Sequence, residues 1–204
     1  MTGDKPSRHD GDSAGDGGSA RRLEIDAPVV ADGPALYRIT RDTGVLDVNS
    51  SYAYLLWCRD FSQTSVVARS AGRVVAFVTG YLRPGAPDTI MVWQVGVEAA
   101  QRGTGVAGKL LGHLVDRLLP RGVRYLETTI TADNIPSIRL FSALARDRSA
   151  GIARSELFPA ELFPAAHQGE DLYRIGPFSV GGPGVPGTTT AVPRAAGDAA
   201  PNGC

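Results

Sequence analysis

The stretch "QRGTGVAGKL", residues 101–110, matches three phosphate-binding patterns at once. Its glycines, Gly103, Gly105 and Gly108, fit the dinucleotide pattern G-x-G-x-x-G, and the residues from Gly103 onward also fit the start of the P-loop pattern G-x-x-x-x-G-K-[ST]. A third pattern, R-x-x-G-x-A, begins at Arg102. All three let backbone N–H groups close around a phosphate at a helix N-terminus, where the helix dipole also favours an anion. The loop therefore predicts a phosphate-bearing ligand, and the flanking sequence has to decide which one.

The residue that follows the loop argues against a P-loop. That pattern needs a Ser or Thr hydroxyl to hold magnesium after its lysine, and Leu110 has none. Lys109 is then expected to be a solvated helix residue.

A dinucleotide fold has more in its favour, because a strand precedes the loop, a helix follows it, and Glu127 lies near the position of a ribose-binding acid. The spacing disfavours it. The first glycine of that fingerprint follows its strand almost directly, whereas residues 98–102 intervene here. Too few core residues follow the loop for the two halves of a dinucleotide fold.

Composition points to one domain with a small-molecule partner. The chain has 204 residues, of which 43% are apolar, which is ample for one core. Lysine plus arginine equals aspartate plus glutamate, so no basic excess indicates nucleic acid or an anionic membrane surface. The two cysteines, Cys58 and Cys204, form neither a disulfide framework nor a C-x-x-C metal pair. No apolar run suits a membrane span or a signal peptide. We expect a soluble, cytoplasmic protein that needs no metal.

The pattern along the chain predicts an α/β fold, a mixed central sheet flanked by helices, in a folded domain over residues 34–176. Residues 1–33 and 177–204 have few apolar anchors, so both are expected to be disordered tails. Strands are expected at 35–39, 65–69, 73–82, 90–97, 124–130 and 171–175, and helices at 50–61 (capped by Asn49 or Ser50), 104–119 (ended by Pro120) and 136–145 (capped by Asp133 or Asn134).

Three long blocks carry a family resemblance. These are "DVNSSYAYLLWCRDF" (47–61), "MVWQVGVEAAQRGTGVAGKLL" (91–111) and "LETTITADNIPSIRLFSALA" (126–145). Together they resemble the diaminobutyrate acetyltransferases of the GNAT superfamily over roughly residues 36–175, with both tails outside the similarity. In that superfamily the R-x-x-G-x-A loop holds acetyl-coenzyme A. The resemblance implies the GNAT acyltransferase fold, acetyl-CoA as co-substrate, and acetylation of the γ-amino group of L-2,4-diaminobutyrate, a step in ectoine biosynthesis and thus osmoadaptation.

The resemblance also implies the cofactor site. The strands at 91–97 and 124–130 should splay apart and hold the acetyl-pantetheine arm between them, while the glycine loop cradles the pyrophosphate. Asn134 is implied to contact this arm, and its alternative role is to cap the N-terminus of the following helix. Many GNAT enzymes have a tyrosine general acid where this chain has Phe141, which has no hydroxyl, so no catalytic residue is assigned. The cofactor-binding residues implied are Val95, Gly96, Val97, Arg102, Gly103, Thr104, Gly105, Val106, Ala107, Gly108 and Asn134.

Acceptor binding is implied for Asp47, Tyr52, Trp93, His167 and Glu170. Each has an alternative: Asp47 could cap a helix, Tyr52 and Trp93 could be core residues, and His167 and Glu170 could lie in a solvated loop. Two other functions stay open, namely acetylation of another small diamine or amino acid and a non-catalytic acyl-CoA sensor.

The resemblance further implies a homodimer in which His167 and Glu170 complete the acceptor pocket, of their own or of the neighbouring subunit. The apolar residues Leu157, Phe158, Leu162 and Phe163 suit such an interface. The alternative is that the two phenylalanines close the core of the monomer.

Overall fold

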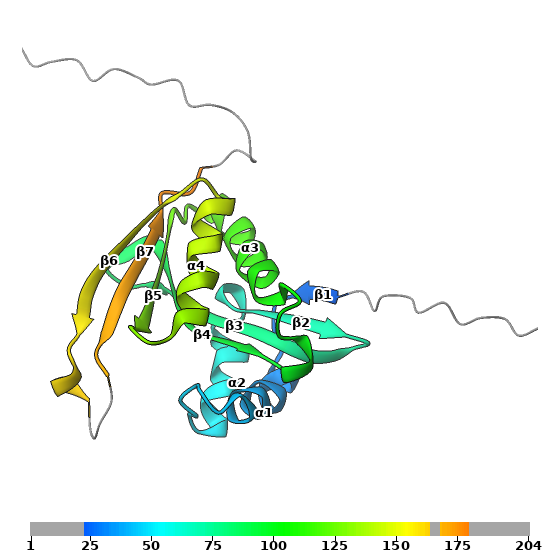
Figure 1. The fold of residues 1–204 in the computed structure, drawn as a ribbon. Helices are drawn as coiled ribbons and strands as arrows, with labels where there is room; N and C mark the ends of the chain where they lie inside the picture. The colour runs from blue at the N-terminus through cyan, green and yellow to red at the C-terminus, as the bar shows by residue number, and fades with distance from the viewer. Residues whose placement is uncertain (1–22, 164–167, 180–204) are drawn as a thin grey trace, which may run out of the picture.

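The computed structural model describes residues 23–163 and 168–179, which fold around one seven-stranded mixed sheet (Figure 1). The strand order is β1-β2-β3-β4-β5-β7-β6; β4 and β5 are parallel, and the other neighbours are antiparallel. The strands are β1 Leu23–Asp26, β2 Val66–Ser70, β3 Arg73–Arg83, β4 Ala86–Val97, β5 Tyr125–Thr131, β6 Gly151–Phe158 and β7 Glu170–Gly176.

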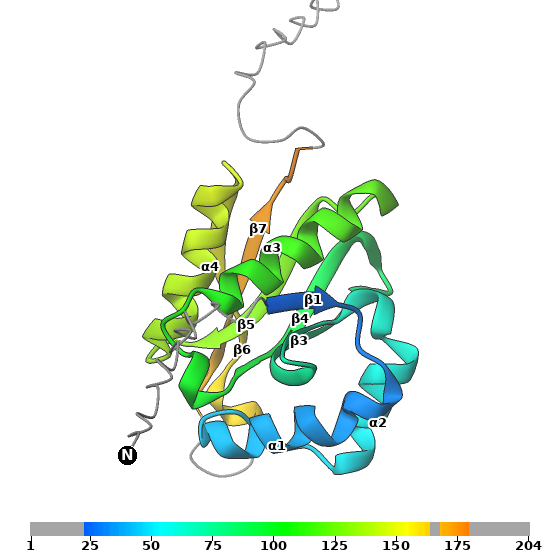
Figure 2. The ribbon, with the colours of Figure 1, turned by 90° about the vertical axis from the view of Figure 1, so that its right-hand side faces the viewer.

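Helices cover both faces of this sheet, so the predicted architecture is confirmed. In Figures 1 and 2, α3 and α4 lie on one face and α1 and α2 on the other. The α-helices are α1 Gly33–Thr43, α2 Ser51–Asp60, α3 Val106–Leu118 and α4 Ile135–Asp147. Short 3-10 turns join them: η1 Val30–Asp32, η2 Ser62–Thr64, η3 Ala99–Gln101, η4 Leu119–Arg121 and η5 Ala160–Leu162.

The main core lies beneath α3. This helix buries an apolar stripe at helical spacing against β2, β3 and β4, as the sequence predicts. A smaller core beneath α1 and α2 contains Leu36, Ile39, Tyr54 and Phe77. The two cores fix the sheet from both sides.

The strand predicted at 35–39 is wrong, because these residues belong to helix α1. Pro34 lies in the first turn, where a missing backbone N–H costs no hydrogen bond. Leu36, Ile39 and Thr40 are buried at positions i, i+3 and i+4, a helical spacing that a five-residue window hides.

The expected boundaries of the tails are also wrong. Within the predicted N-terminal tail, β1 pairs with β2, and the carboxylate of Asp32 accepts two hydrogen bonds of 2.7 Å from Arg69. Within the predicted C-terminal tail, Phe178 is buried in the main core. Residues 1–22 and 180–204 lie outside the described residues. Strand β6 was not predicted, because all eight of its residues are exposed and it has no burial pattern.

Candidate active site

A cavity of about 930 Å³ lies where β4 parts from β5. The two strands pair only from Thr89 to Met91 on β4 and from Tyr125 to Glu127 on β5, although both strands run on beyond these residues. The predicted splay is therefore confirmed. The cavity is lined by Thr43, Val45, Leu46, Val95, Val97, Gln101, Arg102, Gly103, Gly105, Val106, Ala107, Gly108, Thr131, Asp133, Asn134, Pro136, Ser137 and Leu140.

The glycine loop forms one wall of this cavity. Gly103 and Gly105 have φ angles of 76° and 78°, in the left-handed region that favours glycine. Helix α3 begins directly afterwards, and Gly105, its N-cap residue, has no side chain to cap it. The first amides of a helix have no intrahelical partner, so those at the start of α3 are available to an anion in the cavity.

Most of the predicted cofactor residues line this cavity, but Gly96 and Thr104 do not. A Cβ at Gly96 would meet the ring of Phe77 at 2.3 Å, on the sheet face that α1 and α2 cover. The hydroxyl of Thr104 donates to the carbonyl of Gln101 within the loop. Asn134 lines the cavity and also caps α4, since its Oδ1 accepts a hydrogen bond from the amide of Ser137.

Residues of the α1–α2 connection form the opposite wall, which the sequence did not reveal. Thr43, Val45 and Leu46 line the cavity together with Pro136 and Leu140 of α4. Val45 is 84% exposed, and no sequence pattern links it to the glycine loop, which lies far along the chain.

A β-bulge turns the predicted acceptor residue Trp93 toward α2. Thr79 pairs with Gln94 and Gly80 with Val92, so Trp93 is the extra residue on β4. The Trp93 ring lies 6.2 Å from that of Trp57, which also packs near Phe61 and Tyr81. The bulge thus creates an aromatic surface beside the splay.

The same bulge brings Gln94 beneath the connection that carries Asp47. The buried side chain of Gln94 donates from Nε2 to the carbonyl of Asp47 at 2.8 Å, and its Oε1 accepts from the hydroxyl of Tyr54 at 3.4 Å. The Tyr54 oxygen also accepts from the amide of Asn49. Hydrogen bonds thereby connect Asp47 to β4 and Asn49 to α2.

None of the four predicted acceptor residues that the structure describes lines the cavity, although Asp47 and Glu170 each adjoin a residue that does. Asp47 is exposed and follows the cavity residue Leu46; the helix cap that it could have formed is Ser50 instead. Tyr52 and Trp93 are 63% and 51% exposed, so neither is a core residue. Glu170 begins β7 and pairs with Thr131, which lines the cavity. His167 lies outside the described residues.

The carboxylate and hydroxyl side chains that line the cavity are those of Thr43, Thr131, Asp133 and Ser137, and the Asp133 carboxylate accepts hydrogen bonds from Thr131 and Gln168. Phe141 is buried in the main core. Cys58 is also buried, and this burial raises the pKa of its thiol to about 12, so the thiol stays protonated. Within residues 23–163 and 168–179, no cluster of three or more His, Cys, Asp or Glu side chains could hold a metal ion.

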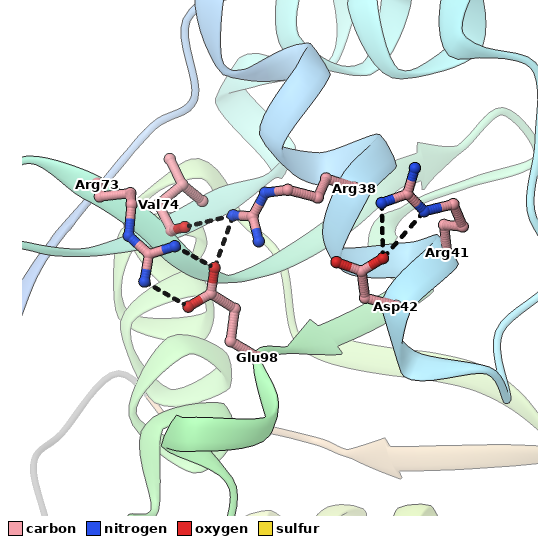
Figure 3. A network of polar contacts seen from close by, with 6 residues as sticks. All are labelled: Arg38, Arg41, Asp42, Arg73, Val74 and Glu98. Carbon is pink, nitrogen blue, oxygen red and sulfur yellow. Dashed lines mark hydrogen bonds and ion pairs between the residues drawn. The ribbon is translucent and has the colours of Figure 1, made fainter.

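A guanidinium–carboxylate network fixes α1 against the end of β4 (Figure 3). Glu98, directly after β4, binds Arg73 through both oxygens at 2.9 Å and Arg38 of α1 at 2.6 Å. Arg38 also donates to the carbonyl of Val74. The network therefore holds α1, whose last residue Thr43 lines the cavity, against the residue that leads from β4 toward the glycine loop.

The family model for the acetyltransferase (GNAT) family matches residues 34–145. An L-2,4-diaminobutyric acid acetyltransferase of Streptomyces coelicolor is 55% identical over 163 residues, covering 78% of this chain and 96% of the relative. One from Nocardia farcinica is 54% identical, with 75% and 79% of the two chains covered. The chain belongs to the GNAT family, in its diaminobutyrate acetyltransferase branch.

Solved structures agree with this placement of the GNAT acetyltransferase. Diaminobutyrate acetyltransferase EctA from Paenibacillus lautus, in complex with L-2,4-diaminobutyric acid and coenzyme A, matches with a TM-score of 0.75 and 35% identity. The match covers 78% of this chain and 98% of that one. A ribosomal-protein-S18-alanine N-acetyltransferase from Escherichia coli, 21% identical with a TM-score of 0.60, shares the fold. Across the described residues, no helix has the length and apolar character to span a membrane.

Proposed function

We propose that this GNAT enzyme transfers the acetyl group of acetyl-CoA to the γ-amino group of L-2,4-diaminobutyrate, giving the acetylated precursor of ectoine. The observation that carries the proposal is the cavity at the splay, with the glycine loop on one wall and the segment before Asp47 on the other. The diaminobutyrate acetyltransferase relatives support the acceptor.

The splayed strand supplies the groups that the chemistry needs. The residues of β4 beyond Met91 have no partner on β5, so the backbone groups of Val95 to Val97 on that edge can hold the pantetheine arm and donate to the thioester oxygen. A neutral amine attacks the thioester carbon, and a C–N bond forms. The C–S bond then breaks, its electron pair leaves with the sulfur of coenzyme A, and the proton of the amine passes to water or to the thiolate. Because no cysteine of the described residues lines the cavity, we propose direct transfer with no thioester acyl-enzyme.

Acceptor recognition rests on charge complementarity. Diaminobutyrate carries two ammonium groups in solution, and Asp47 and Glu170 each lie beside a residue of the cavity wall, Leu46 and Thr131. We propose that these carboxylates, with Tyr52, Trp93 and His167, bind the acceptor. This favours an enzyme over a non-catalytic acyl-CoA sensor, which needs no acidic acceptor side.

The position of the acetyl group tests the proposed function. NMR of the product should show the acetyl amide on the γ-nitrogen. An amide on the α-nitrogen would contradict the proposed orientation, and the absence of coenzyme A release with diaminobutyrate would contradict the proposed acceptor. Asp47→Ala should raise the KM for the acceptor while leaving the binding of acetyl-CoA nearly unchanged.

We also propose a homodimer formed through the edge at β6. All of β6 is exposed, including Ile152, Leu157 and Phe158, and Phe158 at 41% exposure belongs to neither core. An unpaired apolar edge strand normally needs covering. Phe158 pairs with Glu170 in the β6–β7 ladder, so an interface here adjoins the acceptor side.

Light scattering tests this assembly. The wild-type protein should have the mass of two chains, and Phe158→Glu should lower it toward one. Val30→Glu, at a similarly exposed apolar residue outside β6, is the matched control and should leave the mass unchanged. A wild-type monomer would overturn the proposal.

We propose a cytoplasmic location, because the free thiol of Cys58 and the use of acetyl-CoA suit a cytoplasmic enzyme. Cell fractionation would check this location.

A further inference from the structure

A buried carboxylate holds two half-exposed arginines on the sheet face opposite α4. Glu127 of β5 is 2% exposed, and its two oxygens bind Arg83 of β3 at 2.7 Å and Arg174 of β7 at 2.5 Å. The side chains of Arg83 and Arg174, the arginine pair, remain 46% and 38% exposed. One carboxylate with two guanidinium groups leaves a net positive charge, and each guanidinium has further N–H groups that can bind an anion.

Glu127 and Arg174 lie at the vertex of the splay, and Arg83 reaches Glu127 with its side chain from the hairpin end of β3, where it pairs with Ala86. Glu127 pairs with Met91 in the last step of the β4–β5 ladder and with Arg174 on β7. The neighbouring residues Leu126 and Ile175 point into the main core beneath α3 and α4, so Glu127 and Arg174 point to the opposite face.

That opposite face also holds the proposed acceptor residues. Trp93 lies two residues beyond Met91, roughly 7 Å along β4. Glu170 lies four residues from Arg174, an even spacing that puts both on one face of β7. The arginine pair therefore lies just short of the gap that receives the acetyl arm, on the acceptor side.

The ring of Tyr125 fixes one of the two guanidinium groups. The central carbon of the Arg174 guanidinium lies 3.9 Å from the centroid of that ring. A stacked guanidinium that is also bound to a carboxylate has little freedom left, so its remaining donors are pre-organised. Nothing in the proposed transfer step uses this arrangement.

The acceptor residues proposed so far include no cation for the α-carboxylate of the acceptor, and the arginine pair can supply one. Asp47 and Glu170 complement the two ammonium groups of diaminobutyrate, but its α-carboxylate also needs a cationic donor when water is excluded. From the carboxyl carbon to the γ-nitrogen the acceptor spans roughly 5 Å. A carboxylate at the vertex therefore leaves the γ-nitrogen near Trp93, where the splay opens.

We propose that Arg83 and Arg174, positioned by Glu127, bind the α-carboxylate of the acceptor and select an α-amino acid over a simple diamine. This inference rests on the proposed function, because it assigns the carboxylate subsite of the same acceptor. Glu127 is a positioning residue, which acts through the two arginines and does not touch the substrate.

The test compares L-2,4-diaminobutyrate with 1,3-diaminopropane, which has the same two amines and no carboxylate. The wild-type enzyme should have the higher kcat/KM with diaminobutyrate. Arg83→Met should lower that value roughly 10- to 100-fold, as expected for a lost hydrogen bond between charged groups, and should leave kcat/KM for diaminopropane and the KM for acetyl-CoA nearly unchanged. Arg83→Lys keeps the charge and should recover part of the loss.

Glu98 offers a matched control, because two arginines, Arg38 and Arg73, bind its carboxylate as well. Arg73→Met removes a guanidinium from Glu98 just as Arg83→Met removes one from Glu127, and in each case one arginine stays on the carboxylate. Arg73→Met should not change the ratio between the two acceptors. Equal losses with both acceptors in Arg83→Met, or an unchanged ratio, would overturn the carboxylate subsite. A wild-type enzyme that fails to acetylate diaminobutyrate would overturn the proposed function itself, so the two failures are distinguishable.

Discussion

The side chain of Gln94 on β4 donates a hydrogen bond of 2.8 Å to the backbone carbonyl of Asp47, which lies 47 residues earlier in the chain. Gln94 is buried, so both of its polar atoms need partners, and Tyr54 provides the second. The β-bulge at Trp93 is what turns Gln94 to this face. The acceptor-side segment and the cofactor-binding strand are therefore coupled through one amide.

We expect Gln94→Met to raise the KM for diaminobutyrate roughly 5- to 30-fold and to leave the KM for acetyl-CoA nearly unchanged. Methionine fills a similar volume but leaves the Asp47 carbonyl without its donor, which costs about 1–2 kcal/mol. Tyr54→Phe removes two longer hydrogen bonds of 3.4 Å, to Gln94 and from Asn49, but keeps the bond from Gln94 to Asp47, so it should have a smaller effect in the same direction. Steady-state kinetics with each substrate varied would check this; an effect confined to acetyl-CoA would refute the coupling.

Gly108→Val should raise the KM for acetyl-CoA strongly without unfolding the protein. A Cβ at Gly108 has no atom within 4 Å and its φ is ordinary, so the new side chain would project into the cavity space that the ligand needs. His113→Val introduces the same β-branched residue at an exposed position of the same helix and serves as the control. Isothermal calorimetry with coenzyme A would measure both; equal affinities in the two variants would place the phosphates elsewhere.

Asp32 should stabilise the fold in a pH-dependent way. Burial by itself raises the pKa of this carboxyl, but hydrogen bonds from Arg69 and from the amide of Val29 outweigh it and hold the pKa below its usual value. A lowered folded-state pKa means that the stabilisation is fully present above pH ~4, the unfolded value, and is lost as the pH falls through the folded value.

Asp32→Asn should therefore lower the free energy of unfolding at pH 7 by about 2–4 kcal/mol, because it leaves Arg69 without its charge partner. The difference from wild type should shrink as the pH falls below ~4. Urea unfolding of both proteins across this range would measure it. A constant difference down to pH 2 would show that the loss does not come from the ionised carboxylate.

Mixing two inactive variants should not restore activity if each acceptor pocket is built within one chain. Glu170 pairs with Thr131, and Asp47 follows Leu46; both of these partner residues line the same cavity of one chain. An Asp47→Ala chain and a Glu170→Ala chain therefore each have a defective pocket, even in a mixed dimer. Activity that returns after subunits demonstrably exchange would show instead that a pocket takes one carboxylate from each chain.

Local patterns predicted the elements that bury a regular stripe. Helix α3 was predictable because its apolar residues recur at helical spacing, and the N-caps at Ser50 and Asn134 follow from their own side chains. Strand β6 escaped because nothing along it is buried, and α1 was mistaken for a strand because five residues are too few to separate the two periods.

The parts of the site that depend on tertiary pairing could not be predicted. The bulge at Trp93 exists only because β3 pairs in two registers with β4. Arg83, Glu127 and Arg174 come together from three strands, and no sequence spacing reveals that Glu127 is their shared carboxylate. The residues of the glycine loop were found because they are contiguous, whereas the cavity wall at Thr43 and Leu46 belongs to a different part of the chain.

Acceptor specificity is measured most directly by the release of free coenzyme A thiol with a panel of acceptors: L-2,4-diaminobutyrate, ornithine, lysine and spermidine. We expect rapid release with diaminobutyrate and the highest kcat/KM of the panel, since the acceptor must span from the vertex of the splay to the gap beside Trp93. Faster turnover of a longer diamine would contradict the assigned acceptor. No thiol release with any of them, despite tight binding of acetyl-CoA, would contradict the enzymatic function.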